Sequence, residues 1–359
     1  MNDISIVYHD DFKKYDFGPG HPLRGSQCMD GEIAFELVSS DQGLKERSTI
    51  SFVEPEEATE EDILSVHTKE YVDFVKSLSE TGGPITLDTP VFKGMYPLAK
   101  LFAGANILGG KLVFDGAAEK SFVFGIMGHH VGADFGGGFG LINDIAIAIN
   151  YYRKHYGLKR TMVVDYAANA GHGTESIYYD TPEVLCIDIH QDPLNLYPGK
   201  GFPEQVGRGE GTGYTVNIAL PPYSSDDHFL LAMNELVVPI ALEYRPELII
   251  AVGLNGCHFT VEINQLMLGL EGLRETVRIL SALSNDLCDG KFVHIGGFSL
   301  DAKLLGPGFL ATVAGALDVG VELHEPYAIP EDIPDVSEDV EESLENTKNI
   351  QSKYWKSLQ

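Results

Sequence analysis

The sequence predicts a single α/β domain in three layers, with a mostly parallel central sheet between two layers of helices. Short apolar runs rich in β-branched residues, such as 162–166 and 248–252, alternate with longer segments of helical periodicity. The chain has 359 residues, of which 44% are hydrophobic, enough to fill one large core. Loops of small and polar residues follow several apolar runs, where parallel sheets collect functional side chains.

The first half of the chain alternates predicted strands and helices. Within 60–80, the apolar residues Ile63, Val66 and Val72 recur at helical spacing. Small residues along 94–115 allow a helix there to pack closely. In order, we expect a strand at 4–8, a helix at 31–48, one or two helices within 60–80, a helix at 94–115, a strand at 121–126, a helix at 141–157 and a strand at 162–166.

The second half continues this alternation and ends in an acidic segment. We expect a strand at 184–189, a helix at 227–244, a strand at 248–252, helices within 263–288, a strand at 292–295 and a helix at 306–319. The sequence therefore predicts a domain over 1–325 and an acidic C-terminal tail over 326–359. A terminal helix is predicted at 338–356, and the aromatic residues Tyr354 and Trp355 near its end favour docking onto the domain.

The composition of the chain indicates which partners it can bind and in which cell compartment it is expected. The formal net charge is −28, so the surface repels nucleic acid and favours cationic partners such as basic tails or polyamines. An acidic host proteome or a salty cytoplasm would explain the same charge without a functional role. We find no long apolar run and no signal peptide, which predicts a cytoplasmic protein without a membrane span. The four cysteines have no paired spacing, which argues against a disulfide framework or a CxxC zinc site.

Polar and glycine-rich motifs follow the expected strands. The segment after 162–166 reads AANAGHG, adjacent histidines His129 and His130 follow 121–126, and Asn255 follows 248–252. In a parallel sheet these loops lie at one edge, so their side chains are expected to meet. The other motifs are Tyr15 to Pro22, His67 to Tyr71, Gly138 to Asp144, Ile187 to His190, Tyr197 to Gly199, Glu204 with the glycines at 207, 209, 211 and 213, Pro246 to Ile249, and Gly296-Gly297.

Together these motifs, over about 6–300, resemble the zinc deacetylases of the arginase/deacetylase superfamily. These are the histone deacetylases, the acetoin-utilization deacetylases and the acetylpolyamine amidohydrolases. The resemblance implies an arginase/deacetylase-like fold and a site for zinc-dependent amide hydrolysis. It also implies zinc ligands in a D-x-H motif and in a later Asp. The aligned positions here are Ala167, Asn169 and Asn255, so the chain resembles a divergent member that lacks the ligands. Alanine offers no donor atom, and a neutral amide is a poor zinc ligand.

Further departures affect the rest of the implied chemistry. The family's oxyanion-stabilising tyrosine follows a Gly-Gly pair, but Phe298 stands at that position and has no hydroxyl group. Differences also occur at four positions outside the ligand set. They indicate natural divergence rather than a few designed substitutions. These positions are Gly140, Cys257, His258 and Ile295.

The resemblance implies catalytic roles for His129 and His130, each oriented by its own partner. Asp165 is retained as the partner of the first histidine. His172 stands where an Asn or Asp orients the second, and a His–His pair tunes basicity differently from a His–carboxylate pair. The alternative is that both histidines are retained scaffold residues without chemistry.

The resemblance also implies an acyl-lysine tunnel. Its aromatic walls would be Phe139, which follows Gly138, and Tyr197, with Asp88 at the rim holding the substrate backbone. The alternatives are that Phe139 and Tyr197 are core aromatic residues and that Asp88 caps a turn, which is ordinary for Asp before Thr-Pro.

Two cation sites remain open at this stage. Family members hold a monovalent cation near the D-x-H loop, and the resemblance therefore implies a K⁺ or Na⁺ ion beside Asp165 and Asp188. The alternative is that the two carboxylates bind no ion and accept hydrogen bonds from backbone N–H groups. Cys257 and His258 carry metal-binding side chains beside Asn255, so a displaced metal site is conceivable. Zinc at the family position, or any other cofactor, is not expected.

Two classes of function therefore compete. The first is a pseudoenzyme, inactive as a zinc deacetylase, that binds a ligand or regulates a partner. The second is an enzyme of altered chemistry on an acylated amine or a related C–N bond, using His129 and His130 with no metal or a displaced one. A collapsed pocket would favour the first class, and an open pocket with convergent polar groups would favour the second. An acyl-lysine-like or polyamine-like ligand, a protein partner and a homo-oligomer all stay open.

Overall fold

The computed structural model describes residues 2–125, 127–253 and 255–359. Its centre is an eight-stranded sheet with the order β2-β1-β5-β10-β9-β6-β7-β8. Every neighbouring pair in this sheet is parallel, which confirms the predicted α/β class. The strands are β1 (Asn2–Val7), β2 (Ser48–Val53), β5 (Lys120–Val123), β6 (Thr161–Asp165), β7 (Val184–Gln191), β8 (Thr215–Leu220), β9 (Leu248–Val252) and β10 (Phe292–Ile295).

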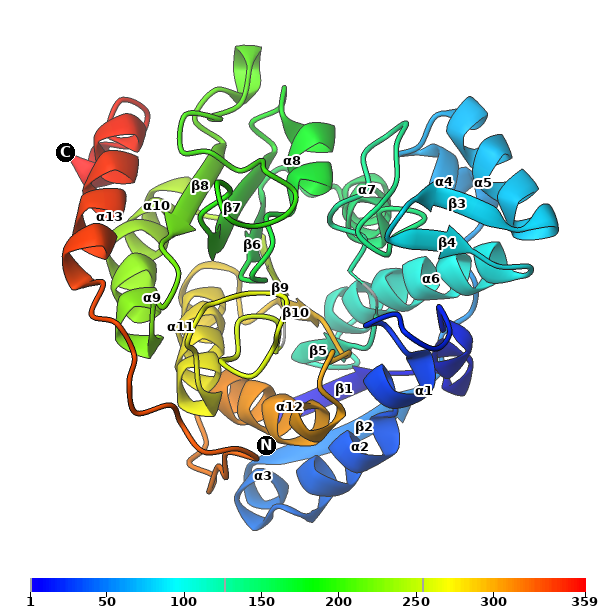
Figure 1. Ribbon diagram of the computed structural model, residues 1–359, viewed down its shortest axis with the longest axis horizontal. Coiled ribbons are helices and arrows are strands. Elements are labelled where there is room, and N and C mark those ends of the chain that lie inside the picture. Colours follow the sequence, from blue (N-terminus) through cyan, green and yellow to red (C-terminus); the bar gives the residue numbers. More distant parts are fainter. Residues whose placement is uncertain (1, 126, 254) are drawn as a thin grey trace.

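Helices cover both faces of the sheet, as the three-layer prediction requires (Figure 1). One layer contains α6 (Met95–Phe114), α7 (Asp144–Tyr156) and α8 (His172–Tyr178), with α4 (Glu60–Leu64) and α5 (Lys69–Thr81) outside it. The other layer contains α2 (Gly31–Ser40), α3 (Gln42–Arg47), α9 (Asp226–Ala232), α10 (Val238–Tyr244), α11 (Leu270–Leu287) and α12 (Ala302–Leu317). The short helix α1 (Gly25–Cys28) and an antiparallel hairpin of β3 (Gly83–Thr86) and β4 (Thr89–Val91) lie outside the layers.

The start of α7 ties together the segments that form the site. The Asn143 side chain accepts a hydrogen bond from the backbone N–H of Ala146, which caps the helix. The same side chain donates to the Val131 carbonyl at 2.8 Å and to Thr174 Oγ1 at 3.0 Å. The loop after β5 and the first turn of α8 are thereby fixed relative to each other.

Several elements differ from the prediction. The expected helix 31–48 is two helices, because Asp41 ends α2 and caps α3 by accepting from the Leu44 N–H. The helices expected within 263–288 are one helix, α11, which begins at Leu270. Strands β2 and β8 and the short helix α8 were not predicted. Of the expected strand 121–126, residue Ile126 lies outside the described residues.

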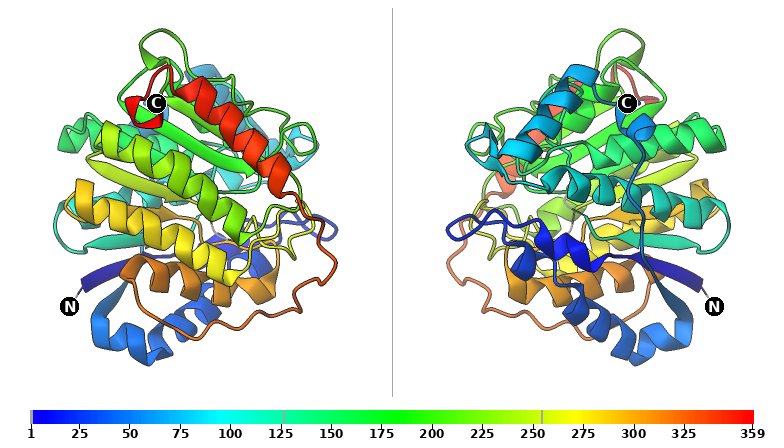
Figure 2. Two further views of the ribbon diagram at one scale, coloured as in Figure 1. Left: turned by 90° about the vertical axis from the view of Figure 1, so that its left-hand side faces the viewer. Right: turned by 90° about the vertical axis from the view of Figure 1, so that its right-hand side faces the viewer.

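The C-terminal helix α13 (Ser337–Gln351) covers the outer edge of β8 (Figure 2, left). Four side chains spaced four residues apart donate to carbonyl groups spaced two residues apart: Ser343 to Ala219 at 2.5 Å, Thr347 to Asn217 at 3.5 Å, Gln351 to Thr215 at 3.1 Å and Trp355 to Gly213 at 3.0 Å. Four helical residues rise about 6 Å and two strand residues about 6.6 Å, so the two repeats match. The helix therefore occupies an edge that would otherwise be open to pairing with another strand.

A search of the helices in the described ranges finds none that is long and apolar enough to cross a membrane.

Candidate functional site

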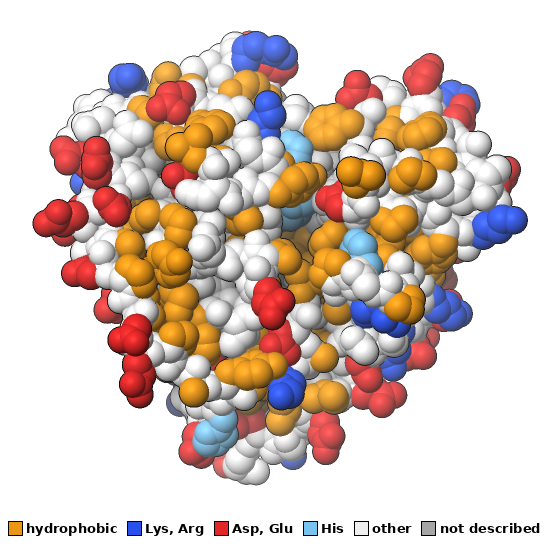
Figure 3. All heavy atoms as spheres, viewed as in Figure 1, with side chains coloured by type: hydrophobic (Ala, Val, Ile, Leu, Met, Phe, Trp, Pro, Cys, Tyr) orange, Lys and Arg blue, Asp and Glu red, His pale blue; other side chains and the backbone are white. Residues whose placement is uncertain are grey.

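A cavity of about 490 Å³ opens at the carboxyl ends of the central strands. Figure 3 shows this face hollowed near its centre, with hydrophobic and histidine side chains around the hollow. The lining residues are His21, Pro22, Asp88, Met127, His129, His130, Gly138, Phe139, Ala167, Ala168, Asn169, Leu196, Tyr197, Asn255, Gly256, Ile263, Phe298, Ser299 and Leu300. The strand-end loops therefore meet as the sequence predicts, and the cavity is open rather than collapsed.

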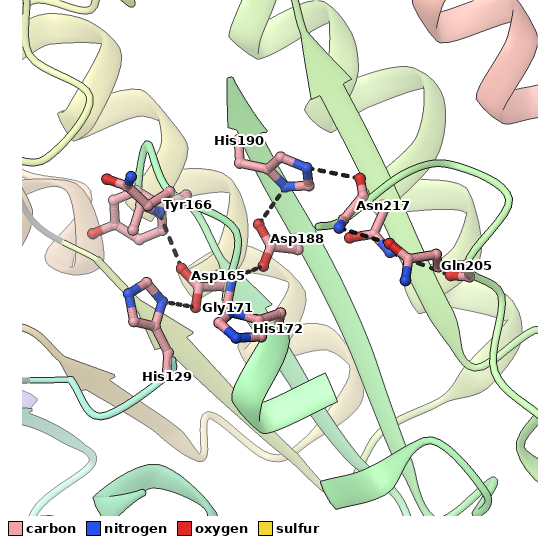
Figure 4. Close-up of polar contacts among 12 residues, drawn as sticks. His129, Asp165, Tyr166, Gly171, His172, Asp188, His190, Gln205 and Asn217 are labelled. Carbon is pink, nitrogen blue, oxygen red and sulfur yellow. Dashed lines mark hydrogen bonds and ion pairs between the residues drawn. The ribbon is translucent and has the colours of Figure 1, made fainter. Parts of the chain in front are cut away.

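His129 is paired with a buried carboxylate. Its Nδ1 lies 2.8 Å from Asp165 Oδ2, and both side chains are almost fully buried (Figure 4). Burial opposes a charge on His129, but the carboxylates of Asp165 and Asp188 outweigh this effect and raise the pKa of the imidazole above its usual value. Because Nδ1 faces Asp165, Nε2 is the ring nitrogen available to the cavity.

His130 is paired with another imidazole. His130 Nδ1 lies 3.4 Å from His172 Nδ1, and His172 is the first residue of α8. Burial lowers the pKa of His130 well below its usual value, and the neighbouring His129 and His172 lower it further. Burial likewise lowers the pKa of His172 to about 4. Both rings of this pair are therefore neutral at pH 7.

The three positions at which the resemblance implies zinc ligands do not present a ligand set. Ala167 offers only a methyl group. Asn169 Nδ2 donates to the Tyr197 carbonyl at 2.8 Å, and Asn255 Nδ2 donates to the Leu304 carbonyl at 2.9 Å. Among the described residues, no three His, Cys, Asp or Glu side chains are grouped so that they could hold a metal ion. The residues at this site therefore do not fit the family's zinc.

The residues that the resemblance assigns to a tunnel and its rim are found around this cavity. Phe139, Tyr197 and Phe298 all line it. Asp88 lines the cavity and also accepts from the Thr89 hydroxyl at 3.0 Å, so it is part of a turn as well as of the rim. At Gly138, with φ +56°, a Cβ would lie 2.1 Å from His130, so only glycine fits there.

Asp165 and Asp188 are linked through Gly171 and the loop after β6. Asp188 Oδ2 accepts from the Gly171 N–H at 2.6 Å, and its Oδ1 lies 2.7 Å from His190 Nδ1 (Figure 4). The second oxygen of Asp165 accepts from the Ala167 N–H at 3.1 Å. All four carboxylate oxygens thus have protein partners, as in the alternative without an ion. A K⁺ or Na⁺ ion at this place stays a prediction.

Cys257 and His258, the candidates for a displaced metal site, lie outside the lining of the cavity. Cys257 is buried and donates its thiol to the Tyr166 carbonyl at 2.6 Å. His258 is also buried, with Nε2 2.9 Å from Glu325 Oε2. Neither side chain lines the cavity that contains His129 and His130, because each is directed to a partner in another segment. The sequence places these residues beside Asn255 but does not reveal which way they point.

The lining residues that sequence reasoning did not single out include Met127, Leu196, Ile263, Ser299 and Leu300. Met127, Leu196 and Ser299 each adjoin a residue that the motifs did identify, namely Gly128, Tyr197 and Phe298, and this adjacency was the available signal. Ile263 belongs to a loop whose course the sequence does not reveal.

Comparison with known proteins identifies the class of protein that this fold and cavity represent. The histone deacetylase domain matches residues 30–303, so the chain belongs to the histone deacetylase family. A probable deacetylase of Archaeoglobus fulgidus is 34% identical over 98% of this chain and 98% of its own length. The acetoin utilization protein AcuC of Bacillus subtilis is 29% identical over 84% of this chain and 78% of its own length.

The fold is similar to that in the crystal structure of the HDA15 HD domain. The TM-score is 0.83 at 24% sequence identity, and the similarity covers 100% of this chain and 97% of that one. At this identity the comparison supports the fold alone.

Proposed function

We propose that this histone-deacetylase-like chain cannot perform zinc-dependent amide hydrolysis and acts as a ligand-binding or regulatory pseudoenzyme. The observation that carries the proposal is the state of the three implied ligand positions. Ala167 has no donor atom, and Asn169 and Asn255 offer only neutral amide oxygens, which are poor zinc ligands beside a carboxylate or an imidazole. A catalytic zinc supplies both the activated water and the polarised carbonyl, so the mechanism is removed rather than weakened without it.

The retained cavity supports binding. Its volume of about 490 Å³ falls within the usual range for small-molecule sites. Phe139 and Tyr197 provide apolar walls suited to the methylene chain of an alkyl amine, with Asp88 at the rim. The Archaeoglobus fulgidus relative is named a probable deacetylase, which makes an acylated amine the first ligand class to consider. The net charge of −28 favours a basic protein tail or a polyamine as its carrier.

A second candidate is an enzyme of altered chemistry. The open cavity favours it, because His129 presents Nε2 to the lining while Asp165 fixes its orientation. Such a dyad could act as a general base on a ligand or a water molecule. The two candidates differ in one observable, which is whether a bound acylated amine is consumed.

The test combines metal analysis with an activity assay. We expect the purified chain, dialysed against metal-free buffer, to contain no stoichiometric zinc or iron by plasma mass spectrometry and not to hydrolyse an acetyl-lysine peptide. The matched variant carries Ala167→Asp, Asn169→His, Asn255→Asp and Phe298→Tyr, and it is expected to gain zinc. Close to one zinc or iron per parent chain would overturn the proposal. Metal-free turnover of the peptide would instead favour the second candidate.

A further inference from the structure

The floor of the cavity is apolar where the resemblance places zinc and the oxyanion donor. Met127, Ala167 and Phe298 each follow a central strand within a few residues, so they lie deep, whereas the rim residues belong to the outer loops. Met127 and Ala167 are buried, and Phe298 is partly buried. The Met127 thioether lies beside Gly296, with its sulfur 3.2 Å from the position of a Cβ on that glycine. This floor offers a thioether, a methyl group and an aromatic ring.

Few polar atoms remain available to a ligand at this depth. The Nδ1 atoms of His129 and His130 are engaged with Asp165 and His172, which leaves one ring nitrogen of each histidine for the cavity. The amide N–H groups of Asn169 and Asn255 are directed to backbone carbonyl groups. An amide bond presents one N–H and one C=O, which two ring nitrogens can serve. Asn255 also lies in the lining, and its Oδ1 is buried with no partner among the described residues, so it can accept one further N–H or O–H group. Any other polar group that reached the floor would be buried without a partner, at considerable cost.

We propose that the cavity takes a straight acyl chain of medium length, joined to a primary alkyl amine through an amide, in preference to an acetyl group. This inference rests on the proposed function, since it specifies the acylated amine that the retained cavity binds. The recognised chemistry is the same whether the amine is a lysine side chain in a protein or one end of a polyamine. An acetyl group leaves the floor uncovered, and an apolar cavity of this kind gains from being filled.

The size of the effect follows from the area buried. Each buried methylene contributes about 0.8 kcal/mol, which is about a fourfold change in affinity. The dissociation constant should therefore fall about fourfold with each methylene added beyond acetyl, until the chain fills the floor. The Met127 side chain is unbranched and flexible, so it can adjust to chains of somewhat different length.

The first experiment is isothermal titration of the full chain with one lysine peptide carrying an acetyl, butyryl, hexanoyl or octanoyl group, or a free amine. N-acyl derivatives of 1,4-diaminobutane form a parallel series, which distinguishes a peptide from a polyamine as the carrier. Tighter binding of butyryl and hexanoyl than of acetyl in either series is the expected result. Equal binding of all acyl groups, or tightest binding of acetyl, overturns this inference and leaves the proposed binding function standing. Failure of every acylated compound to bind overturns both.

A variant locates the acyl chain on the floor. Ala167→Leu fills the floor with a larger side chain, so it should abolish the preference for longer chains while acetyl still binds. The matched control is Ala117→Leu, because Ala117 is exposed and lies outside the cavity lining. If Ala167→Leu keeps the parent's full preference for longer chains, the acyl group does not reach Ala167 and the inference fails. If Ala167→Leu does not fold, the binding series on the parent chain still tests the preference for longer acyl chains.

Discussion

The indole N–H of Trp355 donates a hydrogen bond to the carbonyl oxygen of Gly213, 3.0 Å away. The same ring packs edge-to-face against Tyr214 and Tyr244, with ring centroids 5.5 Å and 6.2 Å apart. Trp355 is the last of the side chains through which the C-terminal segment follows β8, and it fixes the end of α13 on the body of the domain.

Replacement of Trp355 by alanine should therefore destabilise the protein. Loss of a buried tryptophan typically costs about 3–5 kcal/mol, and here it also frees the Gly213 carbonyl. Urea denaturation followed by circular dichroism measures the change in the free energy of unfolding. Tyr354→Ala is the control, because the neighbouring Tyr354 is 40% exposed. Equal, small losses for the two variants would show that α13 contributes little to stability.

Replacement of Gly138 by alanine should disturb the cavity as well as the backbone. An alanine at φ +56° is strained, and its Cβ would overlap the His130 ring. Gly116 provides a matched control, because its φ is +73° and nothing lies within 4 Å of its added Cβ. Gly116→Ala should cost only the backbone strain, about 1–2 kcal/mol. Gly138→Ala should cost more and also weaken binding of an acylated peptide. If the two variants lose the same stability and bind alike, His130 is not held by that contact.

The pairing of His129 with Asp165 predicts a pH dependence of stability. The pKa of His129 is raised in the folded chain, so folding favours the protonated ring. This contribution is fully present below the unfolded pKa of about 6.5 and is lost as the pH rises through the folded pKa. Histidine titration by NMR should give His129 a pKa above that of a free histidine, and Asp165→Asn should lower it. An unchanged pKa in Asp165→Asn would contradict the assigned pairing.

The His130–His172 pair predicts a response to one substitution. His172→Asp places a carboxylate next to His130, so the pKa of His130, now held well below its usual value, should rise. His172→Asn is the matched control, because it supplies a neutral partner and should leave His130 uncharged at pH 7. The measurement is the same NMR titration. A similar pKa of His130 in both variants would mean that residue 172 does not set its basicity.

The sequence identifies the strands inside the sheet and misses β2 and β8, which are its two end strands. β9 is a continuous apolar run, and β6 and β10 are apolar except for Thr161, Asp165 and His294, which is close to the pattern of a central parallel strand. β2 is an edge strand with several exposed residues, and its start follows directly on α3, so it resembles the end of a helix. β8 follows a glycine-rich loop that offers no periodic signal.

Part of the candidate site could be predicted from the sequence, and part could not. That His129, His130 and Asp165 meet could be predicted, because the carboxyl ends of parallel strands share one edge of the sheet. The direction of each side chain could not be predicted. Asn255 is bonded to the Leu304 carbonyl and His258 to Glu325, and both partners are distant in sequence. Such contacts depend on the packing of α12 and of the segment after it, which local sequence does not encode.

The cover that α13 provides for β8 has a consequence during synthesis of the chain. The Ser343–Ala219 contact joins residues 124 positions apart, so β8 leaves the ribosome well before its cover exists. At the usual 5–20 residues per second, translation of that interval takes about 6–25 s. Throughout this time the outer carbonyl groups of β8 lack the side chains that cover them in the complete chain, and such an edge is open to pairing with another strand.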